Sequence, residues 1–340
     1  MFLHRPFFLR TPVKQTWMQQ TKIFNQITWT NAILGLLFLG WQMIAGEIPM
    51  GWQIGYFIIM IGATGIPHGA LDHIVARTSA EKAQKTFDIP GFLLKYVTAI
   101  AVYSFFWMQF PGISLVLFLL ISAWHFGETD LSAAANTMPW KFSRLLWGTF
   151  VLLMILLTHQ TQTAQLVMRI TNQSETAKSL LNFFATNGYY IIALILALCI
   201  GSIYVANRKH PWKINFFHLI NLSIIMALCA ALPLLPAFAL YFGGWHAIRS
   251  FEIIFNFLHA ERNEAAKTPI SMWTNALPMT FLAAIGFVFM AFIWKGTGLQ
   301  TDPLPFVFIF LSVITLPHLD VMDDLISKGG GIKKKLKQTI

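Results

Sequence analysis

Long apolar segments recur along the whole of this 340-residue chain. A helix needs about 20 mostly apolar residues to cross the hydrocarbon core of a bilayer, and ten windows of the sequence approach or exceed that length. They extend over 27–46, 53–71, 92–110, 113–131, 143–158, 188–206, 214–231, 237–258, 275–294 and 304–325. Only 11% of the residues are charged, whereas a soluble globular domain carries about a quarter. An ordinary soluble enzyme is therefore excluded, and we predict an all-α, polytopic transmembrane helical bundle of about ten spans (eight to ten).

The lysines and arginines lie mainly on one side of these predicted spans. Of the 24 basic residues, 19 fall in segments on one face of the bundle, and the loops on the opposite face hold only Arg169, Lys178 and Lys295. Cytoplasmic loops of membrane proteins carry an excess of Lys and Arg. The pattern therefore predicts a multi-pass protein of the cell (inner) membrane with both termini in the cytoplasm.

The chain divides into one large unit and two basic flanks. We predict a single transmembrane catalytic domain at 27–325, a basic cytoplasmic N-terminal arm at 1–26 and a basic cytoplasmic tail at 326–340. The lysines of the tail are expected to contact anionic headgroups. The partner predicted for the formal charge of +10 is thus the lipid bilayer and not nucleic acid. The polar stretch at 159–187 contains no motif, and the sequence assigns it no function.

Four of the predicted spans carry a histidine at a similar depth. These histidines are His68, His125, His246 and His318. All four spans run from outside to inside, and each histidine lies about ten to sixteen residues from the outer end, so the depths differ by no more than ~9 Å. Ionisable residues within lipid are costly and usually functional. We predict that the bundle gathers these imidazoles around one metal ion; for a single histidine, a hydrogen bond to a neighbouring helix is the alternative.

Carboxylates follow three of the four histidines. They are Asp72, Glu128 and Asp320, which come four, three and two residues after His68, His125 and His318. Residues three or four apart share a helix face, and a carboxylate beside a metal-binding histidine fixes its tautomer and raises its basicity. We expect these carboxylates to support the ligands. His73 is open to three interpretations: a metal ligand, a supporting group or a loop residue.

The choice of metal follows from the ligands and the membrane setting. An imidazole set without cysteine leaves zinc, copper and iron open. A protein built of membrane spans offers its metal chiefly to lipid-soluble substrates and to oxygen, which favours non-haem Fe(2+). The clustered histidine boxes of the di-iron membrane desaturases and hydroxylases are absent from the sequence. We therefore predict a mononuclear site.

Four short segments around these histidines resemble a known family. They are Pro67–Asp72 (PHGALD), Trp124–Asp130 (WHFGETD), Tyr241–His246 (YFGGWH) and Pro317–Asp323 (PHLDVMD). They look like the four signature segments of the Brp/Blh family of membrane beta-carotene 15,15'-dioxygenases, in the same order, over about 50–325. The resemblance implies a membrane iron enzyme that uses molecular oxygen to split beta-carotene at its central double bond into two all-trans retinal molecules. It also implies a rhodopsin as the receiver of the retinal.

The resemblance extends to the ligands with one departure. It implies that His68, His125 and His246 are iron ligands. Family members commonly have a second histidine four residues after the third of these, where this chain has Ser250, a poor ligand for ferrous iron. We favour His318 as the replacement because it matches a family histidine; His73, a water molecule, or an altered or lost activity are the alternatives.

Two other functions are compatible with histidines inside a membrane. A transporter or channel would use the intramembrane His, Asp and Glu residues for protons or divalent metal. A haem-binding or assembly factor would use paired histidines as axial ligands. Visible absorption of the purified protein distinguishes a haem protein from a histidine-bound iron enzyme, because haem has a strong Soret band and a ferrous histidine site has none.

Overall fold

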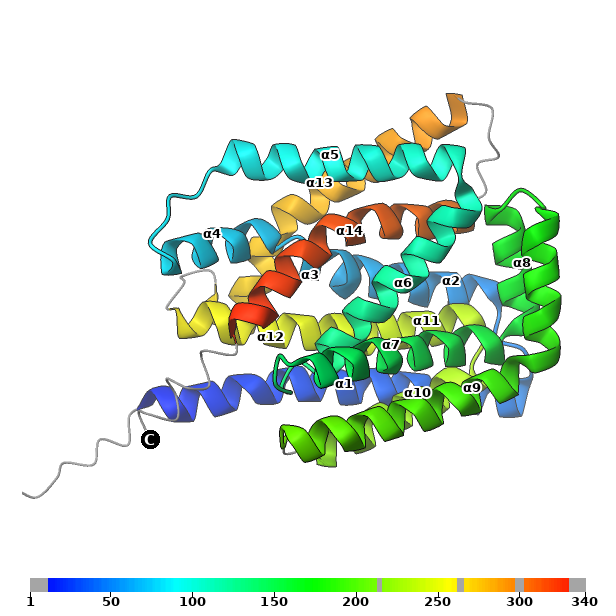
Figure 1. The fold of residues 1–340 in the computed structure, drawn as a ribbon, viewed down its shortest axis with the longest axis horizontal. Helices are drawn as coiled ribbons and strands as arrows, with labels where there is room; N and C mark the ends of the chain where they lie inside the picture. Colours follow the sequence, from blue (N-terminus) through cyan, green and yellow to red (C-terminus); the bar gives the residue numbers. More distant parts are fainter. Residues whose placement is uncertain (1–11, 213–215, 262–265, 297–302, 330–340) are drawn as a thin grey trace, which may run out of the picture.

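The computed structural model of the protein describes residues 12–212, 216–261, 266–296 and 303–329. Within these ranges every regular element is a helix, and Figure 1 shows most of the long helices running along one common direction. Eight helical stretches of the described chain are long and apolar enough to cross a membrane. The protein is therefore a multi-pass helical bundle, and the predicted fold class is confirmed.

The spanning stretches follow the predicted windows closely. One is composite and consists of α2 (Met50–Met60), the π-helical segment η1 (Ile61–Gly65), α3 (Ile66–Gly69) and α4 (Asp72–Lys82). The others are α1 (Pro12–Ala45), α5 (Ile89–Gln109), α6 (Pro111–Asp130), α7 (Met138–Thr158), α9 (Glu175–Lys209), α13 (Pro269–Gly296) and α14 (Pro303–Gly329).

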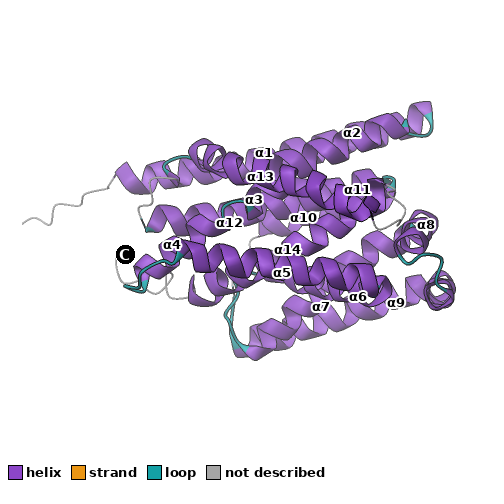
Figure 2. Cartoon of the chain, turned by 90° about the horizontal axis from the view of Figure 1, so that it is seen from above, coloured by secondary structure: helices purple, strands orange, loops and turns teal. Residues whose placement is uncertain are grey.

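Three further elements complete the described fold. The seventh and eighth predicted windows correspond to α10 (Phe216–Ala231) and to a continuous rod of α11 (Leu234–Tyr241), η2 (Phe242–His246) and α12 (Ala247–Ala260). The short helix α8 (Gln160–Ile170) lies across one end of the bundle, as Figures 1 and 2 show. We call this the α8 end, and we call the opposite end, where the α4–α5 and α6–α7 connections lie, the basic end.

Local sequence signals account for several helix ends. Proline occupies the first turn of α5, α6 and α7, where its missing N–H is not needed. Asp88 caps α5 by accepting a hydrogen bond from the backbone N–H of Gly91 at 3.1 Å. The structure also shifts two predicted boundaries. Helix α7 begins at Met138, before the predicted window, and the predicted arm at 1–26 is helical from Pro12 onward as the first part of α1. The outermost parts of the arm and tail, 1–11 and 330–340, lie outside the described residues.

Helices α6 and α7 approach each other closely at two glycines. A Cβ atom on Gly127 would collide with the backbone carbonyl of Arg144, and one on Gly148 would collide with the carbonyl of Ala123. Small residues allow such approach of helix backbones inside membranes. His125 lies two residues before Gly127, so this contact sets the position of the histidine-bearing turn of α6.

The two π-helical segments, η1 and η2, pack against each other. The hydroxyl of Thr64 donates a hydrogen bond to the carbonyl of Gly243 at 2.9 Å. A Cβ atom on Gly65 would come within 2.8 Å of the ring of Phe242, so only glycine fits between the segments. Single π-helical turns occur frequently at functional sites. Here one precedes His68 by three residues and the other ends on His246.

Candidate metal centre

Three buried histidines from separate elements meet inside the bundle. His68 comes from α3, His125 from α6 and His246 from the end of η2. Each contributes one ring nitrogen to a group whose members all lie within 4.8 Å of one another. The ring centroids of His125 and His246 are 4.7 Å apart, and those of His68 and His246 are 5.6 Å apart. This spacing allows one metal ion to contact all three rings.

The fourth predicted histidine lies against the same group. His318, from α14, is buried, and its ring centroid lies 4.9 Å from that of His68 and 5.0 Å from that of His125. We call these four residues the histidine cluster. The structure thus brings together four side chains that are spread over most of the sequence, as the depth argument predicts.

Several ring nitrogens of the histidine cluster lack a hydrogen-bond partner among the described residues. They are both nitrogens of His125, both nitrogens of His246 and Nε2 of His318. Buried polar groups are nearly always paired in proteins, and each unpaired one costs about 1–3 kcal/mol. Neutral imidazole nitrogens are ligands that first-row metal ions take readily. The cluster therefore fits a metal site, because a bound ion would take one nitrogen from each of these three rings.

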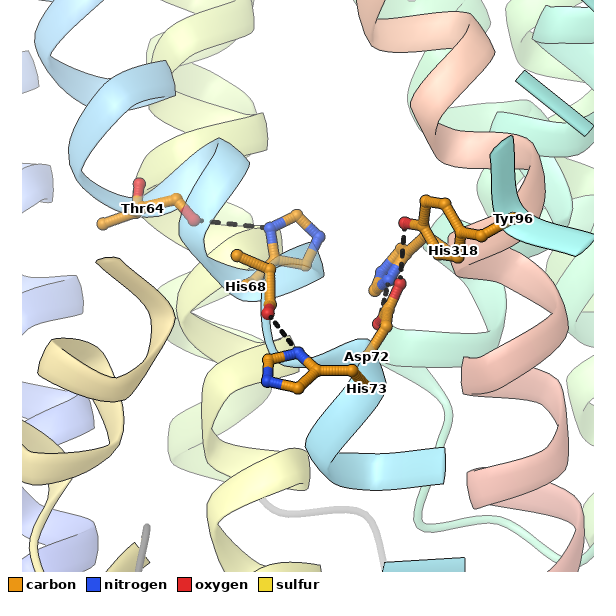
Figure 3. A network of polar contacts seen from close by, with 7 residues as sticks. Thr64, His68, Asp72, His73, Tyr96 and His318 are labelled. Atoms are coloured by element: carbon orange, nitrogen blue, oxygen red, sulfur yellow. Dashed lines mark hydrogen bonds and ion pairs between the residues drawn. The ribbon is translucent and has the colours of Figure 1, made fainter. Parts of the chain in front are cut away.

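Hydrogen bonds orient two of the four rings, as Figure 3 shows. Nδ1 of His68 lies 3.3 Å from the carbonyl oxygen of Thr64. Nδ1 of His318 donates to Oδ1 of Asp72 at 2.8 Å, and the hydroxyl of Tyr96 donates to Oδ2 of the same carboxylate at 3.0 Å. A carboxylate that accepts from Nδ1–H leaves Nε2 of that histidine available for a metal. Asp72 thus fixes the tautomer of His318.

The partner of Asp72 differs from the one that its sequence spacing suggests. The four-residue spacing places Asp72 on the helix face of His68 only if the helix is continuous. The helix is interrupted by a turn at Ala70–Leu71, between α3 and α4, so the carboxylate points elsewhere and bonds His318. Tyr96 has no signal in the sequence, because it is one of two tyrosines in a mostly apolar segment and lies outside every motif.

The remaining predicted site residues make no described hydrogen bond to the histidine cluster. Nδ1 of His73 lies 3.1 Å from the carbonyl of Ala70, so this ring bonds its own turn. Ser250 is fully buried, and its hydroxyl has no hydrogen-bond partner within the described chain. Glu128 is buried and interacts with Arg144 and Asp323 instead of with a ring of the histidine cluster. Asp320 is exposed. Among the predicted carboxylates, Asp72 alone has a described hydrogen bond to the cluster.

A second buried carboxylate joins the elements that carry two of the histidines. Asp130, at the end of α6, accepts hydrogen bonds from Nε1 of Trp147 at 2.9 Å, Nε1 of Trp245 at 2.8 Å and the hydroxyl of Tyr241 at 3.0 Å. These donors come from α7, η2 and α11. Trp245 immediately precedes His246, so Asp130 holds η2 against α6. Sequence reasoning included Asp130 in a motif but gave it no role.

A large apolar cavity adjoins the histidine cluster. Its volume is about 760 Å³, and His68, His125 and His318 form part of its wall. Pockets that bind small molecules usually measure about 300–1,000 Å³. The rest of the wall comes mainly from aliphatic and aromatic side chains of α5, α6, α8, α13 and α14. The cavity therefore suits an elongated apolar ligand lying against the cluster.

The cavity is open between two helices on one flank of the bundle. Its exposed wall residues include Val97 of α5, at 60% exposure, and Ile285 of α13, at 66%. Both helices lie on the same flank of the bundle in Figures 1 and 2. The apolar surface of these helices faces lipid in a membrane, so the opening leads into the bilayer and not into water.

Comparison with known proteins agrees with this site. Residues 59–325 match the family described as Beta-carotene 15,15'-dioxygenase. The chain is also 28% identical over 295 residues to a "Beta-carotene 15,15'-dioxygenase" from an uncultured marine bacterium (66A03), which covers 85% of this chain and 95% of that protein. No solved structure matches the chain. The family match spans all four histidines of the cluster, and the chain belongs to the beta-carotene 15,15'-dioxygenase family of carotenoid-cleaving enzymes.

Proposed function

We propose that this protein uses molecular oxygen to cleave the central double bond of beta-carotene, giving two all-trans retinal molecules, at an Fe(2+) ion. The proposed ligands are His68, His125 and His246, with His318 as the fourth. One observation carries the proposal: buried imidazoles with unpartnered nitrogens form part of the wall of an apolar cavity that opens toward lipid. The family match supports the same reaction.

The ligand set suits the metal that this chemistry needs. Imidazole nitrogens bind iron as well as zinc and copper, and oxidative cleavage requires a metal that changes its oxidation state. A bound Fe(2+) ion would supply the redox chemistry that makes dioxygen reactive toward a carbon–carbon double bond. Ser250 replaces the family's usual histidine, and the position of His318 beside His68 and His125 supports its assignment as the substitute.

The protein's own residues position the substrate and the ligands. The apolar wall holds the polyene straight beside the histidine cluster, and this positioning selects the bond that reacts. The same wall excludes water from the site, which prevents side reactions during cleavage. Asp72 and Tyr96 hold His318 with its Nε2 available. No general acid or base is required, because the reaction adds dioxygen across one bond and yields two carbonyl groups.

The polar groups in the cavity wall argue against transport as the function. A path for protons or metal ions needs available polar groups along its length. Between the histidine cluster and the α8 end, the hydroxyls of Thr163 and Thr315 instead donate to backbone carbonyls, and Ser104 donates to the sulfur of Met290. A polyene requires no such groups, so carotene cleavage is the better interpretation of the cavity.

The cellular setting follows from the same features. We place the protein in the cell (inner) membrane with its basic end in the cytoplasm, because that end carries most of the lysines and arginines. Beta-carotene dissolves in the bilayer and reaches the cavity through the opening between α5 and α13. Retinal leaves by the same route, either into lipid or to a membrane-embedded receiver such as a rhodopsin.

Expression in a carotene-producing host tests the proposal. We expect the wild-type protein to consume beta-carotene, to accumulate retinal and to purify with about one iron per chain. The variants His68→Ala and His125→Ala should each lose retinal formation and iron, because each removes a ligand. His210→Ala is the matched control, since His210 is exposed and lies outside the cluster. Full activity in either cluster variant would overturn the assignment.

A further inference from the structure

The motif-free segment that contains α8 forms one end of the cavity. Four residues of this helix contribute to the wall: Thr163, Leu166, Val167 and Ile170. Building on the proposed function, we propose that α8 is the stop against which one end of the carotenoid rests, and that its distance from the histidine cluster determines which double bond is cleaved.

The histidine cluster does not lie at the middle of the cavity. Along α14 the wall residues run from Phe308 to His318, and the histidine is the last of them. Along α6 they run from Leu115 to Phe126, and His125 is the last but one. Both helices run from the α8 end to the basic end. The cavity therefore extends from the histidine cluster mainly toward α8.

Helix α5 provides a scale for the two arms of the cavity. Its wall residues run from Phe92 to Met108, and Tyr96 marks the level of the histidine cluster because its hydroxyl bonds Asp72 beside His318. Four residues of α5 lie on the basic side of this level and twelve on the α8 side. At the helical rise these are about 6 Å and about 18 Å. The arm toward α8 is the longer one.

The length of the long arm corresponds to half of the substrate. A fully extended chain of single-bonded backbone atoms advances about 3.5 Å for every three bonds, so the arm takes about fifteen bonds of an all-trans polyene. One half of beta-carotene, ring included, is slightly shorter than this. With its ring near α8, the molecule places its central bond beside the histidine cluster, and the second half extends past Phe92 and the lateral opening.

Helix α8 is anchored firmly enough to act as a stop. The hydroxyl of Thr163 donates to the carbonyl of Leu156 at 2.8 Å, and the side chain of Gln162 accepts from the N–H of Leu234 at 2.7 Å. Ile170 and Trp294, which both belong to the cavity wall, are buried in a hydrophobic cluster with Trp107. The end of the cavity is thus bonded to α7 and α11 and packed against α5 and α13.

Substitutions on opposite faces of α8 test the proposal. Val167→Phe fills the end of the long arm and displaces the carotenoid toward the basic end. We expect retinal formation to fall at least tenfold and an unequal pair of aldehydes to appear, because the displaced polyene presents an off-centre double bond. The reaction is otherwise the same: one dioxygen adds, one double bond breaks and two aldehydes form. Gln165→Phe adds the same ring to the exposed face and should behave as wild type.

An apocarotenal that lacks one ring provides the second measurement. The end without a ring should fit the arm that Val167→Phe shortens. We therefore expect this variant to cleave the apocarotenal at a rate within a few-fold of wild type. Products are identified by chromatography and mass spectrometry, with iron content measured on the same samples. Retinal as the sole product of Val167→Phe at the control rate would overturn the proposal. Loss of activity on both substrates at normal iron content would also overturn it. Absence of retinal from the wild-type protein would instead refute the proposed function.

Discussion

Replacing Asp72 by asparagine tests how the fourth histidine is oriented. The carboxylate accepts two hydrogen bonds inside the bundle, from Nδ1 of His318 and from the hydroxyl of Tyr96. Asparagine has nearly the same shape and keeps one oxygen that can accept from the ring. It removes the negative charge, however, and this charge makes His318 a stronger ligand. We therefore expect a fold that is retained and a metal that is bound more weakly.

The magnitude follows from these two hydrogen bonds. Removing a group that hydrogen-bonds a metal-binding histidine typically lowers metal affinity 10–100-fold, and each factor of ten corresponds to about 1.4 kcal/mol. Because asparagine preserves one acceptor, we expect Asp72→Asn to lower the affinity for iron by about tenfold, the lower limit of this range. Asp72→Ala removes both acceptors and should approach 100-fold. Tyr96→Phe leaves the bond to His318 in place and should have the smallest effect.

Competition with a ferrous chelator, followed by retinal assay at saturating iron, measures these effects. The matched control is Asp320→Asn, because Asp320 lies only two residues after His318 but is exposed. We expect this control to retain wild-type iron affinity. An equal loss in Asp320→Asn and Asp72→Asn, or no loss in either, would refute the orientation of His318 by Asp72.

Two further substitutions test other parts of the structure. Ser250→His restores the residue that is usual in the family; since His318 already serves as the fourth ligand in our proposal, we expect no gain in iron per chain. We also expect a loss of about 1–3 kcal/mol of stability from overpacking a fully buried site, and a clear gain in iron would contradict the assignment of His318. Gly127→Ala should lower the melting temperature, because its Cβ collides with the carbonyl of Arg144, whereas Gly112→Ala, where the structure has open space, should not. Equal melting temperatures would refute the close approach of α6 and α7.

Much of the fold was predictable because the bilayer restricts the alternatives. Every predicted apolar window corresponds to a helix or helical rod of the structure. The meeting of His68, His125, His246 and His318 was predictable for the same reason, since helices that cross one slab place equal residue counts at equal depths. The sequence does not reveal the π-helical turns η1 and η2, because these depend on close packing between distant parts of the chain, of Gly65 against Phe242 and of Gly243 against Met60.

Local spacing rules failed where the helix was interrupted or where a partner came from elsewhere in the chain. Asp72 follows a turn, so its spacing from His68 carries no information about its direction. Tyr96 is one of several polar residues scattered along a mostly apolar span, and only the fold shows that it faces Asp72. Helix α8 is too short and too polar to resemble a span, so composition alone indicates a plain loop where the structure has the end wall of the cavity.

The sideways opening of the cavity between α5 and α13 determines how turnover should be measured. The relevant concentration of substrate is its mole fraction in the membrane, because the protein samples only molecules that diffuse within the same leaflets. Diluting the carotene with extra phospholipid at constant total amount should therefore slow the reaction, whereas changing the aqueous volume should not. Detergent tails can occupy the same channel, so rates in micelles depend on the surfactant chosen and rates in nanodiscs give the intrinsic value.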